Sequence, residues 1–475
     1  MSTANAPTRW RSVLPHLDQP LPPDRTPHPQ GATGIQVSLP LELVRQSVQP
    51  KEYWDIPAEV ADAYRVFRPT PLWRARAFER AVDARVPIYV KYEGGNISGS
   101  HKLNTALAQA YYYARAGVRE LVTGTGAGQW GTALAAACAL FGMKCTVFMV
   151  GTSLHHKPHR GTLMRTLGAQ VHASPSNLTD IARQSTTGVN SLSLAIGEAV
   201  EYAARTDGAA FCIGSGETYS ILHQSVIGLE AADQLTALDA RIDTVVGCVG
   251  AGSNFGGIAL PFFAAATAAG TRPPHLVAAE SATTPKLTRG TYAYDRTDAT
   301  GTGPMEAMYT IGSSYPIPDA HAAGLRFHGA AKVLSAMRHR DQITATAVGQ
   351  VQALQAGRLF TRGEMVLPAP ESGHALAAAA RLAGAGTDTA HGPLRAQRGV
   401  LVCVSGHGYL DLSAYQQLMD GELTDDSPDP QALRAAVRGL NRIQQPTRPA
   451  PATAPPPRHT LATPHEATAT AGSRP

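Results

Sequence analysis

The 475-residue chain is poor in cysteine, in aromatic residues and in clustered charge, and each shortage argues against a class of protein. Five cysteines, none in a Cys-x-x-Cys pair, are typical of reduced core residues in a cytoplasmic protein rather than of a disulfide scaffold. The net charge is only +5 and no basic run is interleaved with aromatics, which argues against a nucleic-acid surface. The proline-rich start lacks the apolar core of a signal peptide, and no apolar run reaches membrane-spanning length.

What the chain does contain, from residue 77 onward, is an alternation of strand-like and helical runs joined by short glycine-containing segments. The expected strands are Ile88–Tyr92, Glu120–Thr123, Cys145–Val150, Gln170–Ala173, Ala210–Ile213, Thr244–Val249, Leu276–Ala279 and Val400–Val404. The expected helices are Thr105–Ala116, Thr132–Phe141, His159–Leu167, Leu192–Ala204, Ser220–Leu238 and Phe255–Ala269. This alternation predicts an α/β protein with mostly parallel sheets covered on both faces, and two such sheets fit the length.

One lysine stands where a glycine- and serine-rich loop, Glu93-Gly-Gly-Asn-Ile-Ser-Gly-Ser-His-Lys-Leu-Asn104, passes into a helix. The positive potential of a helix N-terminus lowers the pKa of a lysine and favours its neutral, nucleophilic amine. Schiff-base chemistry needs such an amine, so Lys102 is a candidate catalytic residue. A surface lysine at the start of a helix is the alternative that this stretch alone leaves open.

Two further loops join a strand to a helix through glycines. The first contains Gly126, Gly128 and Gly131 in the GxGxxG spacing of a dinucleotide site, but no acidic residue follows in Lys144–Gly151, so we reject that interpretation. Its small residues can instead hold a substrate carboxylate through backbone N–H groups. The second, Gly250-Ala-Gly-Ser-Asn254, suits a phosphate monoester at the first turn of the next helix. A tight turn without ligand is the alternative for the second loop alone, but pyridoxal phosphate needs both a lysine and a phosphate site.

Two later motifs complete the candidate site. Ser405-Gly-His-Gly408 follows an apolar strand, which places Ser405 at the carboxyl end of that strand, where ligands gather in open α/β sheets. Glu371-Ser-Gly-His374 is the other. The histidines lack metal-ligand spacing, so His223 and His374 are interpreted as structural, and no metal site is predicted.

The two ends of the chain have a different composition. Residues 1–38 are polar and proline-rich and are expected to lie over a surface as an arm. A short helix is predicted within Pro430–Ile443, with Asp429 as its N-cap. From Gln445 onward proline, alanine and threonine dominate, which predicts a disordered tail or, alternatively, a partner-binding one.

Five motifs in order resemble the tryptophan synthase β subunit family, a group of fold type II pyridoxal-phosphate enzymes. They are Gly99-Ser-His-Lys-Leu-Asn104, Thr125-Gly-Ala-Gly-Gln129, Gly250-Ala-Gly-Ser-Asn254, Pro368-Ala-Pro-Glu-Ser372 and Ser405-Gly-His-Gly408. The stand-alone branch is the most similar, through Arg68-Pro-Thr-Pro-Leu72, His223-Gln-Ser-Val-Ile-Gly-Leu-Glu230, Leu287-Thr-Arg-Gly-Thr-Tyr-Ala-Tyr-Asp295 and Gly324-Leu-Arg-Phe-His-Gly329. The similarity covers about residues 39 to 418.

The resemblance implies two three-layer α/β lobes with the cofactor, pyridoxal 5'-phosphate, in the cleft between them. The N-terminal lobe would comprise 39–67 and 101–219, and the C-terminal lobe 68–100 and 220–425, with a short helix and tail in 426–475. It also implies a cytoplasmic homodimer with a small amino-acid substrate and a small nucleophile, and no nucleic-acid or membrane partner.

The resemblance also implies a role for each residue of the matching motifs. Lys102 would be the Schiff-base lysine and the proton carrier at Cα, Ser405 would face the pyridine nitrogen, and Glu371 would lie near the cofactor ring. The other cofactor-binding residues would be His101, Asn104, Gly250, Gly252, Ser253 and Asn254. The amino-acid carboxylate would be bound by Thr125, Gly126, Ala127, Gly128 and Gln129.

One position departs from the family pattern. The family has Thr-Glu-Thr-Gly-Ala-Gly-Gln where this chain has Thr123-Gly-Thr-Gly-Ala-Gly-Gln129, so Gly124 stands at the position of the family's catalytic glutamate. General acid–base assistance contributes roughly a hundred- to ten-thousand-fold to a rate. We therefore expect a diverged substrate, and the volume left by the missing side chain could admit another nucleophile or leaving group.

Three hypotheses follow from these residues. The first is a pyridoxal-phosphate lyase of specialised amino-acid metabolism that performs β-replacement or β-elimination on a serine-like amino acid through an aminoacrylate. The second is an ordinary tryptophan synthase, joining L-serine and indole, with water or Glu371 in place of the missing glutamate. The third is a non-catalytic partner subunit that keeps the fold, although retention of Lys102 argues against it.

Overall fold

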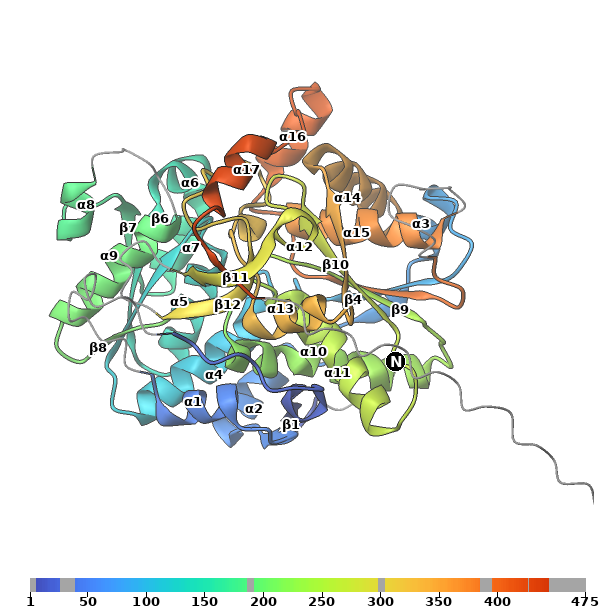
Figure 1. Cartoon of the computed structure of the whole chain (residues 1–475), viewed down its shortest axis with the longest axis horizontal. Helices are drawn as coiled ribbons and strands as arrows, with labels where there is room; N and C mark the ends of the chain where they lie inside the picture. The colour runs from blue at the N-terminus through green and yellow to red at the C-terminus, as the bar shows by residue number, and fades with distance from the viewer. Residues whose placement is uncertain are drawn as a thin grey trace, which may run out of the picture. The chain divides into compact units, whose positions relative to one another are not determined.

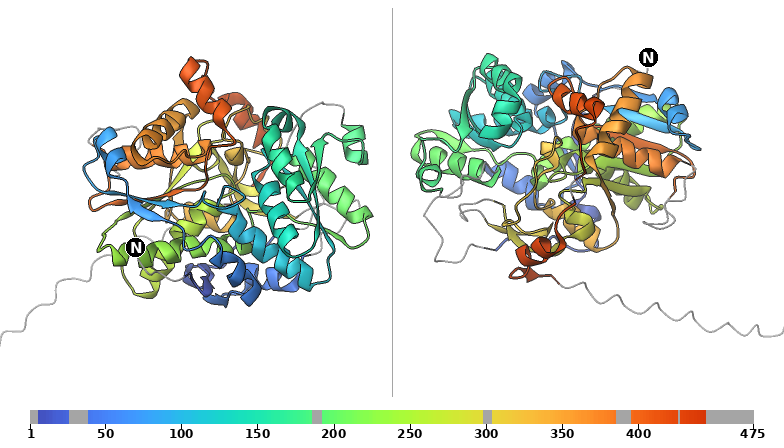
Figure 2. Two further views of the ribbon diagram at one scale, coloured as in Figure 1. Left: turned by 180° about the vertical axis from the view of Figure 1, so that it is seen from behind. Right: turned by 90° about the horizontal axis from the view of Figure 1, so that it is seen from above.

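The structure, a computed structural model, describes residues 6–25, 39–185, 192–297, 304–384, 395–425 and 427–443. The elements below all lie in the unit that ends at Ile443. Figure 1 shows them, and Figure 2 gives the views from behind and from above.

The larger sheet has six strands in the spatial order β13-β10-β9-β14-β4-β3. They are Thr344–Val348, His275–Ser281, Thr244–Cys248, Val400–Val404, Ile88–Tyr92 and Leu72–Arg74. Every neighbouring pair is parallel except β3 with β4, which is antiparallel. The central strand β14 is buried along its whole length, as expected for a parallel sheet covered by helices on both faces.

Alternate residues of β14 pack against different helices. Leu401 and Cys403 join the core cluster that contains α10, Thr218–Ala237, and α11, Ser253–Ala268. Val400 and Val402 join the cluster that contains α14, Gln350–Glu364, and α15, Pro370–Ala383. The period of two along a strand thus produces the two covered faces of the sheet.

The smaller sheet is parallel throughout, in the order β7-β6-β5-β8. Its strands are Gln170–Ser174, Lys144–Val150, Glu120–Thr125 and Ala209–Phe211. On β5, Leu121 packs into the cluster that contains α5, Gln129–Leu140, whereas Val122 packs with α9, Leu192–Arg205. The prediction of an α/β fold with two mostly parallel sheets is confirmed, and all eight expected strands are present.

The starts of three helices lie nearer to the glycine loops than the sequence suggested. α4 spans Lys102–Arg115, α5 begins at Gln129, and α11 begins at Ser253. Gly128 and Gly252, with φ of 86° and 126°, directly precede α5 and α11. Because glycine adopts these angles readily, the chain turns from loop to helix in one residue and places Gln129 and Ser253 in the first turns.

Several strands and two helices were not predicted from the sequence. They are β1 (Arg9–Arg11) paired with β2 (Tyr53–Asp55), the antiparallel strands β11 (Thr291–Arg296), β12 (Met305–Thr310) and β15 (Asn441–Arg442), the strands β3 and β13, and the helices α14 and α15. The remaining helices are α1 (Leu41–Val48), α2 (Ala58–Arg65), α3 (Arg76–Ala81), α6 (Gly151–His156), α7 (Pro158–Thr166), α8 (Asp180–Gln184), α12 (Lys286–Arg289), α13 (Lys332–His339), α16 (Leu412–Asp420) and α17 (Pro430–Ala436). Short 3₁₀ turns lie at Leu14–His16 and Ala323–Leu325.

The N-terminal arm was expected to lie over the surface, but its described part, residues 6–25, is anchored in the core. Trp10 of β1 is fully buried and its ring lies 4.5 Å from that of His223. At the other end, Asp429 caps α17 as predicted, accepting hydrogen bonds from the N–H groups of Gln431 and Ala432 at 2.9 and 3.2 Å. The tail predicted from Gln445 onward lies outside the described residues.

Two further predictions concern larger parts of the chain. The lobe boundaries given above place the four strands of the smaller sheet in the N-terminal lobe, within 101–219, and the six strands of the larger sheet in the C-terminal lobe, within 68–100 and 220–425; this division stays a prediction. Within the described residues, no helix combines the length and the apolar character needed to cross a membrane.

Candidate active site

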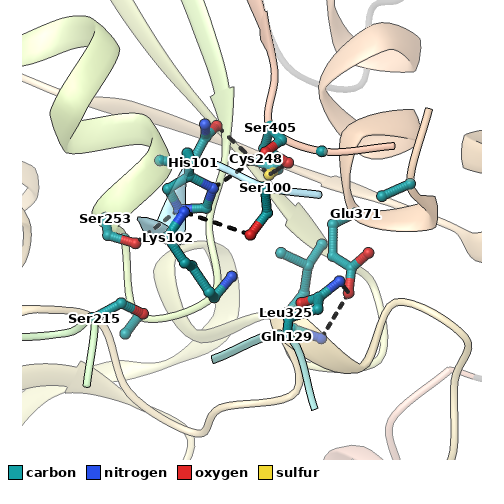
Figure 3. Close-up of a pocket in the computed structure, with 17 residues that line it drawn as sticks. Ser100, His101, Lys102, Gln129, Ser215, Cys248, Ser253, Leu325, Glu371 and Ser405 are labelled. Carbon is teal, nitrogen blue, oxygen red and sulfur yellow. Dashed lines mark hydrogen bonds between the residues drawn. The ribbon is translucent and has the colours of Figure 1, made fainter. Parts of the chain in front are cut away.

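The candidate site is a pocket of about 440 Å³, counting space open to solvent, between the carboxyl ends of strands of the larger sheet and the start of α5. Figure 3 shows Lys102 on one side of it and Glu371 with Gln129 on the other. The residues that line it are Ser100, His101, Lys102, Gln129, Ser215, Cys248, Gly250, Ala251, Gly252, Ser253, Asn254, Gly324, Leu325, Ala369, Glu371, Ser405 and Gly406.

Lys102 is the first residue of α4 and its side chain reaches into this pocket. Burial lowers the pKa of its amine, while the nearby Glu371 carboxylate acts in the opposite direction. The sequence reading attributed a lowered pKa to the helix N-terminus, but removal from water is the largest cause. The result is a lysine inclined towards its neutral, nucleophilic form.

The loop between β9 and α11 forms one wall of the pocket. A Cβ added at Gly250 would lie 2.1 Å from the carbonyl oxygen of Gly324, and one added at Gly252 would lie 2.1 Å from Leu334 Cδ1. Only glycine therefore fits these two positions in this packing. The loop ends at Ser253, whose hydroxyl lies 3.0 Å from His101 Nε2. Burial lowers the pKa of His101 to about 3, so this imidazole is neutral.

Ser405 follows β14, at the carboxyl end of the strand as predicted. Its hydroxyl lies 2.9 Å from that of Ser372 and accepts a hydrogen bond from the thiol of Cys248 at 3.5 Å. Burial raises the pKa of the Cys248 thiol to about 11, so it is protonated at neutral pH. This corner of the pocket therefore presents neutral hydrogen-bonding groups only.

Glu371 lies in the first turn of α15 and is nine-tenths or more buried. Its Oε1 accepts hydrogen bonds from Gln129 Nε2 at 2.9 Å and from the N–H of Gly324 at 2.8 Å. Its Oε2 is buried and has no hydrogen-bond partner. The carboxylate is thus fixed through one oxygen and free at the other (Figure 3).

The loop from Thr125 to Gln129, expected to bind a carboxylate, is closed by a hydrogen bond from the N–H of Gly128 to Thr125 Oγ1 at 3.2 Å. Of its residues, Gln129 lines the pocket. Gly124, just before the loop, lies against α9: a Cβ there would be 2.5 Å from the backbone nitrogen of Ile196 and 2.7 Å from the carbonyl oxygen of Ala195. The volume that the sequence reading assigned to a new nucleophile or leaving group is filled by the backbone of α9, so that expectation is wrong.

A buried ionic network lies beneath the loop that precedes Lys102. Arg68 pairs with Glu93 at 2.9 Å and with Glu230 at 2.7 Å, and Lys91 pairs with Glu230 at 2.8 Å. Asn104, expected beside the cofactor, uses its Oδ1 to accept from Arg68 and its Nδ2 to donate to Gln224. Asn104 is not among the pocket-lining residues, and it connects α4 to this network.

Most of the predicted site residues come together in the one pocket. They are His101, Lys102, Gln129, Gly250, Gly252, Ser253, Asn254, Glu371 and Ser405. Gly124, Asn104, Thr125, Gly126, Ala127 and Gly128 are not among those that line it. The two histidines interpreted as structural are buried, His223 against Gln46 and Thr105, and His374 against the carbonyl of Pro370.

The pocket also contains residues that the sequence reading did not select. Most of them lie within motifs quoted above but were not assigned a role: Ser100, Ala251, Gly324, Leu325, Ala369 and Gly406. Cys248 stands two residues before the glycine loop 250–254. Ser215 lies in a segment without a strand or helix, and nothing in its local sequence indicates a pocket.

Comparison with known proteins first identifies the enzyme family to which the chain belongs. Residues 64–391 match the family described as "Pyridoxal-phosphate dependent enzyme", and the chain belongs to that family. In fold it is similar to a fungal L-serine ammonia-lyase from Rhizomucor miehei, with a TM-score of 0.54 and 16% identity over 74% of this chain and 98% of that one.

The relatives then define the family more closely. The tryptophan synthase beta chain of Thermococcus onnurineus is 41% identical over 440 residues, which are 91% of this chain and 98% of the relative. That of Pyrobaculum islandicum is 44% identical over 428 residues, 89% of this chain and 99% of the relative. The chain is therefore a member of the tryptophan synthase beta chain family.

The pocket fits the cofactor of that family, pyridoxal 5'-phosphate. Two glycines that cannot carry a Cβ precede α11, and the unpaired N–H groups at the start of a helix attract a phosphate. A buried lysine with a lowered pKa supplies the amine, and Ser405 supplies a hydroxyl. In the described residues, no group of three or more His, Cys, Asp or Glu side chains could hold a metal ion.

Proposed function

We propose that the protein catalyses β-replacement or β-elimination on a serine-like amino acid with pyridoxal 5'-phosphate. The observation that carries this proposal is that Lys102, the glycine loop 250–254, Gln129 and Ser405 line the same pocket. A lysine, a phosphate site, a carboxylate-binding residue and a hydroxyl are the parts that this chemistry requires.

Each part has a task in the proposed reaction. When bound, pyridoxal phosphate supplies an electron sink that acidifies the bond between Cα and its hydrogen. Lys102 removes and returns the Cα proton, since its amine is buried and inclined to be neutral. Gly250, Gly252, Ser253 and Asn254 hold the phosphate, and Thr125 to Gln129 orient the amino-acid carboxylate. Ser405, a neutral hydroxyl, favours loss of the β-substituent over transamination. His101 and Asn104 support α4 and the loop before it.

We further propose that Gly124 occupies the position of the family's catalytic glutamate and that the substrate has diverged. The packing of α9 against Gly124 supports this, because a glutamate there would have to displace the backbone of Ala195 and Ile196. The surrounding structure has adapted to glycine at this position rather than leaving a space for the larger residue.

Ordinary tryptophan synthesis from L-serine and indole is the second candidate, because relatives of 41% and 44% identity carry that name. The two candidates differ in the nucleophile, so a panel of amino acids and nucleophiles separates them.

The test supplies purified protein and pyridoxal phosphate with serine, threonine or O-activated serines, each with water, thiols or indole, and identifies products by mass spectrometry. We expect a β-substituted alanine or a keto acid, and none from Lys102→Ala. Tryptophan as the main product would favour the second candidate. No product from any combination would refute the proposal.

We also propose a cytoplasmic homodimer. The five cysteines are buried and unpaired, which suits a reducing compartment. Sedimentation at micromolar concentration tests the dimer.

A further inference from the structure

The proposed reaction needs a second proton-transfer group, because loss of a hydroxyl requires a proton that Lys102 does not supply while it removes the one on Cα. Gly124 has no side chain to provide it, and the space beside Gly124 is filled by α9. The group must therefore be sought among the residues that line the pocket.

The chemistry of those residues leaves one candidate. Lys102 and Glu371 are the charged side chains among them. The pKa of His101 is lowered to about 3, and its two nitrogens lie beside Ser253 and the carbonyl of Ser405. The pKa of Cys248 is raised to about 11, which makes its thiol a poor carrier at neutral pH. A serine hydroxyl both donates and accepts, so it can relay a proton, but it stays neutral near pH 7 and does not carry an extra one.

The geometry of Glu371 suits the task. Gln129 and the N–H of Gly324 fix Oε1 at 2.9 and 2.8 Å, so the carboxylate cannot rotate away. A side chain on residue 324 would collide with this arrangement, since a Cβ there would lie 2.6 Å from Gln129 Oε1 and 2.9 Å from Glu371 Oε1. Oε2 is buried without a partner, and a buried carboxylate oxygen left unpaired is costly unless a ligand completes it.

We propose that Glu371 is the catalytic acid and base for the group on Cβ, in the place of the glutamate that position 124 lacks. This inference rests on the proposed function. In the first half-reaction Lys102 takes the Cα proton, and the electron pair of that bond forms the bond between Cα and Cβ. The bond from Cβ to oxygen breaks with its pair on oxygen, and a proton that Oε2 takes up from solvent or from the substrate ammonium group when the substrate binds completes a water molecule.

The second half replaces the proton that Oε2 gave up. In replacement, the nucleophile forms a bond to Cβ and gives its proton to Oε2, while Lys102 returns its proton to Cα. In elimination, Oε2 regains a proton from solvent, and Lys102 releases the proton that it took from Cα to solvent or to the released product. Protons and electron pairs balance in both cases, and no oxidant or reductant is required.

The role can be separated from mere positioning by changing the leaving group. Glu371→Gln keeps an oxygen to accept from Gln129 and Gly324 but places an amide where Oε2 was. Chloride leaves without a proton, so β-chloro-L-alanine bypasses the acid whereas L-serine does not. We expect kcat with L-serine to fall by roughly a hundred- to ten-thousand-fold and kcat with β-chloro-L-alanine to fall by less than about tenfold, on the same principle.

A matched control uses Glu364, on the neighbouring helix α14. Its carboxylate also accepts from a side chain and from backbone, Trp73 Nε1 and the N–H groups of Ala77 and Phe78, each at 2.9 Å. Glu364→Gln should leave the ratio of the two substrates unchanged. An equal loss of kcat with both substrates in Glu371→Gln, or a rise in KM alone, would overturn the proposal and make Glu371 a positioning residue.

A readout without turnover completes the test. Glu371 raises the pKa of Lys102 by its charge, so in Glu371→Gln the apoprotein should react with pyridoxal phosphate, followed by absorbance, at lower pH than wild type. An unchanged pH dependence would mean that Glu371 does not face Lys102. If wild type converts neither substrate, the proposed function fails, while this titration still reports on the inferred contact.

Discussion

Gly124 has no side chain, and the backbone of α9 lies where one would project. Gly124→Ala adds a methyl group 2.5 Å from the nitrogen of Ile196, so α9 must move away from β5. We expect a loss of about 1–3 kcal/mol, the usual cost of overpacking a core. Urea denaturation measures it. Gly439→Ala is the control, since a Cβ there meets nothing within 4 Å. Equal stability of both variants would contradict the packing described here.

Glu93 is a second residue for which the direction of its effect on stability can be predicted as the pH changes. Burial alone would raise the pKa of its carboxyl, but the charge and hydrogen bonds of Arg68, with Lys91 and Thr70, lower it to about 2 from 4.5. A lowered folded-state pKa stabilises the protein above pH 4.5, and that stabilisation is lost as pH falls towards 2. The difference between the two pKa values corresponds to about 3 kcal/mol of free energy of unfolding.

The measurement is the free energy of unfolding between pH 6 and 2 for wild type and Glu93→Gln. We expect the variant to be less stable at pH 6, because Arg68 loses one of its two buried partners, and to depend less steeply on pH. Parallel profiles would show that Glu93 does not titrate in this range.

Among the elements, α6 and α7 are tied to the segment after β14 by one carboxylate. Asp411 accepts from Lys157 Nζ at 2.5 Å and from Arg160 Nη2 at 2.7 Å, and all three side chains are nearly buried. Asp411→Asn leaves two cations without their counter-charge, so we expect a loss of about 3–5 kcal/mol. Asp420→Asn, an exposed partner of Gln416, is the control and should change stability by less than about 0.5 kcal/mol. Equal denaturation midpoints of the two variants would show that the ion pairs of Asp411 do not stabilise the fold.

The sequence predicted the elements that carry strong periodicity. The apolar runs of β9 and β14 and the glycines before α5 and α11 predicted the parallel sheets and two of the loops of the site. The antiparallel pair of β11 and β12 was not predicted, since the alternation of strands and helices indicates parallel pairing only. Contacts between distant segments had no local signal: nothing near Gly124 indicates that Ala195 lies against it, and nothing in Glu371 indicates which of its oxygens is free.

At the scale of the whole molecule, the pocket is lined from two sides. Gln129 at the start of α5 lies beside the smaller sheet, and the glycine loop 250–254 and Ser405 follow strands of the larger sheet. A ligand that binds the folded chain alone stabilises it by about 2.7 kcal/mol at a hundred times its dissociation constant. We therefore expect the Tm of the apoprotein to rise with pyridoxal phosphate concentration. Lys102→Ala should keep part of this rise, because the phosphate site at the start of α11 remains.

Pyridoxal, which lacks the phosphate, separates the contribution of Lys102 to cofactor binding from that of the phosphate site. If the glycine loop 250–254 is the phosphate site, pyridoxal should raise the Tm of wild type less than pyridoxal phosphate does, and inorganic phosphate should raise the Tm of Lys102→Ala by itself. Changing Gly252 to alanine would bring a Cβ to 2.1 Å from Leu334 Cδ1 at a φ of 126°, so that variant should lose the response to phosphate. An equal response to pyridoxal and pyridoxal phosphate would place the phosphate elsewhere.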